Sequence, residues 1–183
     1  MTRFVPVEPA TATGKAADVL AETRKALGGT PNMTTMMAIS PAVLKGWLAL
    51  NGALAHGVLN SAVREQLAIA TSEYNRCEYC LSAHTFLGAR VGRLDDAELE
   101  LARDARSSDP HTAALLTLSD AIVRGRGIVA DAVIQKARDA GVTDAEIAEV
   151  VAHIALNTFT NYFNLVTGVE NDYAPVVPHS HAG

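Results

Sequence analysis

Apolar residues recur along most of the chain at intervals of three and four positions, which places them on one face of an α-helix. In residues 41–54, for example, Leu44, Trp47 and Leu48 follow this spacing. No segment alternates apolar and polar residues in the way that a half-buried β-strand requires. The pattern therefore predicts an all-α protein.

Residues typical of helix ends divide this pattern into seven or eight predicted helices. Ser40 and Asp109 each precede a proline, which places a capping side chain before proline at the first helical position. Thr143 lies three positions before Glu146, the spacing of a capping box, at the start of the longest predicted helix. We therefore expect one helical domain over residues 13–171.

The two ends of the chain differ from this domain. Residues 1–12 contain two prolines and are predicted to form an extended arm, and residues 172–183 are predicted to form a tail. The tail holds His179 and His181 as an H-x-H pair. That spacing can bind a metal ion, but we interpret it as incidental in a loose tail.

Composition and charge limit the classes of function. The chain has 183 residues, of which 49% are hydrophobic and 19% charged, as in ordinary globular proteins. Its net charge is −5 and no run of Lys or Arg forms a basic arm, so we expect no binding to nucleic acid. The N-terminus lacks the apolar segment of a signal peptide, and no uninterrupted apolar run is long enough for a membrane span. We therefore predict a cytoplasmic protein that binds no membrane.

The two cysteines of the chain lie together in the segment EYNRCEYCLSAH, residues 73–84. Asn75 and Glu78 have the spacing of a capping box, so a helix is predicted to begin at Asn75 with Cys77 in its first turn. On that helix Cys77 and Cys80 are three positions apart, close enough for a disulfide. In a reducing compartment such a pair is more often catalytic or metal-binding than structural.

A possible proton acceptor follows the second cysteine. His84 lies one helical turn beyond Cys80 and is predicted to share its face, whereas Tyr79 is predicted to point away. An imidazole there can take the thiol proton and leave the reactive thiolate, and Glu65 on the preceding helix can orient that imidazole. Two arguments compete over the nucleophile: the helix N-terminus favours Cys77 as the more acidic thiol, and the spacing of His84 favours Cys80. We prefer Cys80.

Other interpretations of the motif remain open. The two thiols can be simple core filling, since free cysteine is among the most buried residue types. The thiols with His84 and Glu65 can also form a metal clip, although a single helix presents the ligands of structural zinc poorly. We predict no metal and no cofactor.

Two features of the last predicted helix are given structural roles. His153 lies on its apolar face and is interpreted as a hydrogen-bonded core histidine rather than a ligand. Residues 157–164, NTFTNYFN, mix polar and aromatic side chains. This segment can line a site entrance, although aromatic residues at that spacing are usually core or subunit interface.

The candidate residues combine into the pattern E-x11-C-x-x-C-x3-H, which runs from Glu65 through Cys77 and Cys80 to His84. With the flanking REQLAIATSEYNRC and the later NTFTNYFN, it resembles the alkyl hydroperoxidase D-like group of the carboxymuconolactone decarboxylase superfamily, above all its peroxidase-related branch. The strong resemblance covers about residues 45–92. It implies an all-α, alkyl hydroperoxidase D-like fold that assembles as homotrimers or homohexamers.

The resemblance also implies a function. Cys80 would be the peroxidatic thiol, Cys77 the resolving thiol, and Glu65 with His84 a proton relay. We therefore expect a thiol-dependent peroxidase that reduces alkyl hydroperoxides or hydrogen peroxide. Its disulfide would be reduced by an external dithiol, which is a lipoyl group in related enzymes. A general thiol–disulfide oxidoreductase and a non-enzymatic redox-sensing oligomer remain alternatives.

One position departs from the pattern of this group. Tyr79 stands immediately before the second cysteine, where the best-studied peroxidases of the group have a histidine. This departure implies a weaker proton relay, or a different substrate or reductant. The decarboxylase branch of the superfamily lacks the C-x-x-C pair, so we do not expect a decarboxylase.

Overall fold

The protein consists of α-helices over the part of the chain that the computed structural model describes, residues 2–179. No strand occurs in that range, so the all-α prediction is confirmed. The helices are, in chain order, α1 Gly14–Leu27, α2 Asn32–Met37, α3 Pro41–Leu54, α4 Ser61–Tyr74, α5 Glu78–Arg90, α6 Asp96–Arg103, α7 Pro110–Arg124, α8 Asp131–Asp139 and α9 Asp144–Thr167. None of these helices is long and apolar enough to cross a membrane.

The described residues hold nine helices, one more than the upper predicted number. The additional helix is α2, whose six residues include the buried Met36 and Met37. A helix of fewer than two turns shows no repeating apolar pattern, so hydrophobic periodicity leaves no signal for it.

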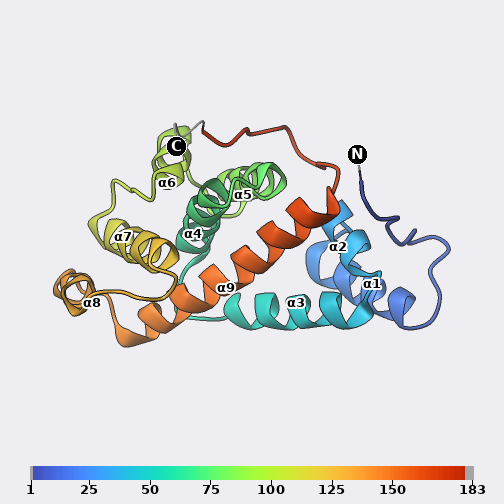
Figure 1. Cartoon of the computed structure of the whole chain (residues 1–183), viewed down its shortest axis with the longest axis horizontal. Helices are drawn as coiled ribbons and strands as arrows, with labels where there is room; N and C mark the ends of the chain where they lie inside the picture. The colour runs from blue at the N-terminus through green and yellow to red at the C-terminus, as the bar shows by residue number, and fades with distance from the viewer. Residues whose placement is uncertain (1, 180–183) are drawn as a thin grey trace.

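The long helix α9 runs across the molecule (Figure 1). It begins at the predicted capping box, where the Thr143 hydroxyl accepts from the N–H of Glu146 and the Glu146 carboxylate accepts from the N–H of Thr143. It ends at Gly168, whose φ of 66° is a left-handed conformation that glycine adopts without strain. Helices α3, α4, α5 and α7 all pack against α9. Side chains of α9 therefore contact helices from both the N-terminal and the central parts of the chain.

Separate apolar clusters hold the helices together. One cluster includes Leu67 of α4 and Val150 of α9, and another includes Leu44 of α3 and Leu156 of α9. A smaller cluster contains both cysteines together with Tyr79 at the start of α5. Both thiols are therefore largely covered by packed side chains.

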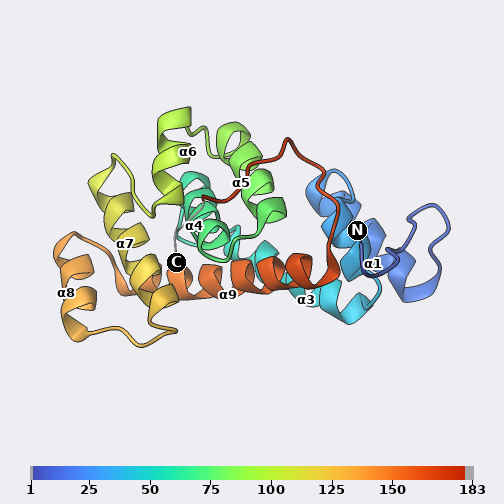
Figure 2. The ribbon, with the colours of Figure 1, turned by 45° about the horizontal axis from the view of Figure 1, so that its top comes forward.

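The segments outside the helices are held against them. Residues 2–13 contain no helix, and the backbone of Arg3 hydrogen-bonds the end of α9. After α9, residues 169–179 cross α5 towards α6 (Figure 2), and the N–H of Val176 donates to Ser82 Oγ of α5 at 2.9 Å. The predicted loose tail is therefore packed against the fold over its described length.

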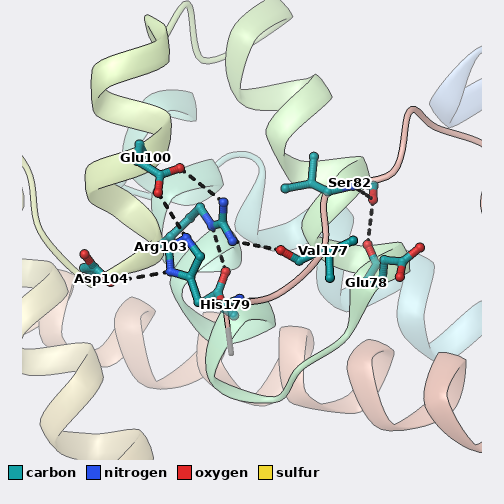
Figure 3. A network of polar contacts seen from close by, with 9 residues as sticks. Glu78, Ser82, Glu100, Arg103, Asp104, Val177 and His179 are labelled. Atoms are coloured by element: carbon teal, nitrogen blue, oxygen red, sulfur yellow. Dashed lines mark hydrogen bonds and ion pairs between the residues drawn. The ribbon is translucent and has the colours of Figure 1, made fainter. Parts of the chain in front are cut away.

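Parts of the predicted ends lie beyond the described residues. His181, the second histidine of the predicted H-x-H pair, lies outside them, as does residue 1 of the predicted arm. His179 pairs with Glu100 of α6, its Nε2 lying 3.1 Å from the carboxylate (Figure 3). The division into arm, domain and tail at the stated boundaries stays a prediction.

Candidate functional site

The turn between α4 and α5 places the two cysteines. Asn75 is the C-cap of α4, and Arg76 then adopts a φ of 58°, which interrupts the helical path. Cys77 is the N-cap of α5, and its sulfur accepts from the N–H of Cys80 at 3.4 Å. The predicted role of Asn75 as the cap of this helix is wrong, because the left-handed residue separates it from α5. Its side-chain amide instead donates to Asn161 Oδ1 of α9 at 2.8 Å.

The two thiols are reduced, buried and in contact. Cys77 and Cys80 are 1% and 3% exposed, and the Cys77 thiol donates to Cys80 Sγ over 2.6 Å. Asn164 Nδ2 of α9 donates to the same sulfur at 3.2 Å. Burial opposes ionisation of Cys80. The hydrogen bonds from Cys77, Asn161 and Asn164 and the charge of His84 outweigh this effect and lower the pKa of the thiol to about 7.

The pKa of Cys77 is raised, first because its proton is held in the bond to Cys80 and then because the thiol is buried. The helix N-terminus argument, which favours Cys77 as the more acidic thiol, therefore does not describe this pair. Cys77 lies at the N-cap itself and donates from its thiol, whereas Cys80 in the first turn accepts from Cys77 and from Asn164 of α9. A pKa of about 7 leaves a large fraction of Cys80 as thiolate at neutral pH.

A carboxylate–imidazole pair lies near the thiols. Glu65 of α4 and His84 of α5 approach to 2.8 Å between Oε2 and Nδ1. Burial favours the neutral imidazole, but the charge and hydrogen bond of Glu65, with a further contribution from Cys80, raise the pKa of His84 above its ordinary value. Within residues 2–179 His84 makes no hydrogen bond to Cys80, so its effect on this thiol is electrostatic.

A cavity of about 250 Å³ is lined by Cys80 together with Glu65 and His84. Cys77 is not part of its lining. Most of the remaining wall is apolar or aromatic and includes Met33, Trp47, Tyr79, Leu87, Leu156 and Tyr173. A small molecule in the cavity therefore meets the sulfur of Cys80 in largely apolar surroundings, beside the Glu65–His84 pair and Arg64.

Tyr79 lines this cavity, which corrects the prediction that it points away from the site. Its hydroxyl donates to Asp172 Oδ2 at 2.6 Å and accepts from the N–H of Met33 at 3.3 Å. Burial and the bond to Asp172 raise the pKa of Tyr79, so it keeps its proton at neutral pH. Because Met33 and the segment after α9 both pack against the first turn of α5, its side chains are enclosed on more than one face. Tyr79 therefore connects these segments through its hydroxyl group, and because this group stays protonated it takes no part in proton transfer at neutral pH.

Part of the chain that contains this site is similar to known proteins. Residues 41–108 match the model of the carboxymuconolactone decarboxylase family. An alkyl hydroperoxide reductase from Mycobacterium tuberculosis is 33% identical over 108 residues, which cover 58% of this chain and 31% of that protein. The match thus spans about a third of the length of this curated relative. The predicted resemblance to the carboxymuconolactone decarboxylase superfamily is confirmed.

Solved structures share the fold. A peroxidase-related protein from Ralstonia eutropha JMP134, described as an alkylhydroperoxidase AhpD core, has a TM-score of 0.82 at 22% identity and covers 93% of this chain and 92% of its own. A peroxidase-related protein from Silicibacter sp. TM1040 has a TM-score of 0.74 at 20% identity over 95% of both chains. A variant of the debrominase Bmp8 in complex with 2,3,4-tribromopyrrole has a TM-score of 0.77 at 16% identity over 94% of both chains. The predicted alkyl hydroperoxidase D-like fold is confirmed.

The buried amides of α9 are site residues that the sequence analysis did not single out. Asn157, Asn161 and Asn164 are 4%, 0% and 3% exposed. Asn161 Nδ2 donates to Ser72 Oγ of α4 at 3.3 Å, and Asn164 reaches Cys80. The sequence does carry a signal for them: the three asparagines are spaced by four and three positions, which places their amides on one face of a helix. The polar half of NTFTNYFN therefore belongs to the site.

His153 of α9 also lines the cavity and is 5% exposed. Its Nε2 has no hydrogen-bond partner in residues 2–179, unlike the hydrogen-bonded core histidine that the sequence predicts. Burial and then the positive charge of Arg64 lower the pKa of His153, so the neutral imidazole is favoured. No three His, Cys, Asp or Glu side chains in the described range converge as a metal site requires.

Proposed function

We propose that this protein is a thiol peroxidase that reduces alkyl hydroperoxides or hydrogen peroxide at Cys80. The observation that carries the proposal is that Cys80, whose pKa is lowered to about 7, lines a cavity of about 250 Å³ together with the Glu65–His84 pair. A cavity of this size admits small molecules and excludes protein surfaces. The similarity to an alkyl hydroperoxide reductase over 108 residues supports the same chemistry.

In the first step the Cys80 thiolate attacks one oxygen of the peroxide. The O–O bond breaks, the sulfur is oxidised to a sulfenic acid, and the other oxygen leaves as alkoxide, or as hydroxide from hydrogen peroxide. His84 in its cationic form supplies a proton to that oxygen, which yields an alcohol or water. Glu65, 2.8 Å from His84, stabilises the imidazolium before the transfer.

In the second step Cys77 resolves the sulfenic acid. Its sulfur, 2.6 Å from Cys80 Sγ in the reduced protein, attacks the oxidised sulfur. The disulfide forms, and the hydroxyl leaves as water with the thiol proton of Cys77. An external dithiol then reduces the disulfide by exchange and is itself oxidised to a disulfide. A lipoyl-type dithiol is the proposed reductant, because a slender molecule can enter the cavity where Cys80 lies.

The proposed compartment is the reducing cytoplasm, and the proposed assembly is a homotrimer or homohexamer. Phe159, Tyr162 and Val166 on α9 are 39%, 57% and 58% exposed. Exposed apolar side chains gathered on one helix are typical of subunit contacts. Light scattering at micromolar concentration should give the mass of three or six chains, and a monomer contradicts this part of the proposal.

Peroxide consumption by the reduced protein with a panel of dithiols tests the function. Without a dithiol the protein should consume about one equivalent of peroxide per chain, and with dihydrolipoamide it should turn over. Consumption no faster than that of free cysteine contradicts the proposal. Reduction of insulin disulfides without peroxide supports a general thiol–disulfide oxidoreductase instead. Disulfide formation that no dithiol reverses catalytically supports a redox sensor.

A second candidate is reductive dehalogenation of an aromatic compound. It is favoured by the aromatic side chains of the cavity, Trp47, Tyr79 and Tyr173, and by the fold shared with a debrominase bound to tribromopyrrole. The Cys80 thiolate would take the halogen from carbon, the ring carbanion would be protonated, and Cys77 would expel halide as the disulfide forms. Release of one bromide per disulfide from a bromopyrrole tests this candidate. Peroxide consumption without bromide release excludes it.

A further inference from the structure

The segment that follows α9, residues 169–179, places one aromatic side chain in the wall of the cavity. Tyr173 lines the cavity although it lies outside every helix. Its ring meets that of Tyr79 edge-on, with centroids 5.9 Å apart and an interplanar angle of 81°. It also lies 5.5 Å from the ring of Phe86, and it packs against the cluster that contains both cysteines. Tyr173, Tyr79 and Trp47 line the cavity and give it an aromatic wall, and Phe86 supports Tyr173 from outside the lining.

The residue before Tyr173 is fixed to two helices. Asp172 Oδ2 accepts from the Tyr79 hydroxyl at 2.6 Å and from the N–H of Asn32, the first residue of α2, at 2.9 Å. Hydrogen bonds to a charged acceptor are stronger than those between neutral groups. Asp172 therefore attaches the segment to α5 immediately before the second cysteine.

The residues on either side of Tyr173 have further attachments to α5 and α6, and Figure 3 shows Ser82 and Arg103, which hold the segment after Tyr173. Ser82 Oγ accepts from the N–H of Val176 at 2.9 Å and from Asn171 Nδ2 at 3.0 Å. Arg103 Nη2 of α6 donates to the carbonyl of Val177 at 2.9 Å. Because the chain is held both before and after Tyr173, its ring is oriented before any ligand arrives.

Tyr173 presents an uncharged aromatic ring to the cavity. Burial and then the charges of Asp172 and Glu65 raise the pKa of Tyr173, so the phenol stays neutral at physiological pH. The hydroxyl makes no hydrogen bond within the described residues. Phenylalanine at this position would therefore keep the wall intact, whereas alanine would remove it.

We propose that Tyr173 is a substrate-contacting residue, and that the aromatic wall makes the site select hydroperoxides with an aromatic organic group over hydrogen peroxide. The inference rests on the proposed peroxidase function and names its preferred substrate class. Contacts between aromatic rings change affinity by about two- to tenfold. Hydrogen peroxide has no organic group to make such contacts, so its reduction does not depend on the wall.

The binding half of the proposal can be tested without turnover. Trp47 is the single tryptophan of the chain and lines the cavity, so its fluorescence reports occupancy. The probe is cumyl alcohol, the product of cumene hydroperoxide reduction. Tyr173→Phe should bind it within about twofold of the native protein, and Tyr173→Ala about fivefold more weakly. Ser82→Ala, which loosens the segment but keeps the ring, should also weaken binding. The matched control Tyr74→Ala, at an exposed tyrosine outside this cavity, should not.

The kinetic half compares kcat/KM for cumene hydroperoxide and hydrogen peroxide in the same proteins. The ratio of the two should fall about fivefold in Tyr173→Ala and stay unchanged in Tyr173→Phe and Tyr74→Ala. Tyr173→Leu, apolar but not aromatic, provides the same comparison if the alanine variant unfolds. Equal or tighter binding of cumyl alcohol by the variants without a ring overturns the inference. If no protein reduces either peroxide while the ring still determines binding, the proposed function fails and the aromatic-binding wall stands.

Discussion

The side-chain amide of Asn164 donates a hydrogen bond to Sγ of Cys80 at 3.2 Å, across 84 positions of sequence. Both residues are buried, so the bond forms where little water competes for it. A donor to a sulfur favours its ionised form. The acidity of Cys80 therefore depends on the last helix of the fold as well as on its own motif.

Replacing this donor should make Cys80 less acidic. In Asn164→Leu the thiolate loses one hydrogen bond, so the pKa of Cys80 should rise from about 7, and a higher pH is needed for the same thiolate fraction. The rate of alkylation by iodoacetamide at pH 7 should fall about threefold or more. Asn157→Leu is the control, because that buried amide donates to the carbonyl of His153 and not to a thiol. Identical pH profiles for the two variants would argue against a role for Asn164.

Removing the carboxylate beside His84 should slow peroxide attack at neutral pH. Glu65 raises the pKa of His84, so Glu65→Gln lowers it and leaves less imidazolium at pH 7 to stabilise the Cys80 thiolate and to protonate the leaving oxygen. We expect single-turnover peroxide consumption about tenfold slower at pH 7. His84→Ala should have an effect in the same direction. Both variants should recover partly at high pH, where the thiolate forms without help.

The exposed Glu22→Gln on α1 is the matched charge control for this series. It should retain the native rate across the pH range. Equal slowing in Glu22→Gln and Glu65→Gln, or no slowing in either, would remove the proton relay from the proposal.

The buried ion pair that anchors the C-terminal segment should contribute strongly to stability. Arg103 Nε lies 2.8 Å from Glu73 Oε2, and their side chains are 12% and 2% exposed. Arg103→Met leaves a buried carboxylate unpaired, so it should lower the free energy of unfolding by about 3–5 kcal/mol, as measured by urea denaturation. Arg124→Met, which breaks the exposed pair with Asp120, should cost less than about 1 kcal/mol.

A second substitution separates loss of the pair from loss of packing. If the unpaired charge is the cause, Arg103→Met combined with Glu73→Gln should be more stable than Arg103→Met alone. A double variant that is as unstable as the sum of the two single changes contradicts this cause.

Local patterns in the sequence predict much of the fold and part of the site. The capping residues Asp109 and Thr143 begin α7 and α9 as expected, since a cap depends on neighbours within one turn. The spacing of Glu65 and His84 on consecutive helices anticipates their contact at 2.8 Å. These features rest on interactions between residues that are near in sequence or on adjacent helices.

The features that are missed depend on contacts between distant segments. Tyr79 and Tyr173 meet because the chain returns over α5 after α9, and no local periodicity encodes that return. The start of α5 is displaced because Arg76 adopts a left-handed φ without the glycine or asparagine that usually marks such a turn. Asn164 carries a visible helical spacing, but only the packing of α9 against α5 identifies its partner.

Trapping of the sulfenic acid tests most directly whether Cys80 is the peroxidatic thiol. Reduced Cys77→Ser and Cys80→Ser proteins are mixed with one equivalent of cumene hydroperoxide and then with dimedone, and labelling is located by mass spectrometry. Cys77→Ser should consume the equivalent and carry dimedone on Cys80, because the thiolate remains and the resolving thiol is absent. Cys80→Ser should consume almost none and remain unlabelled. Dimedone on Cys77 in Cys80→Ser, with none on Cys80 in Cys77→Ser, would contradict the account.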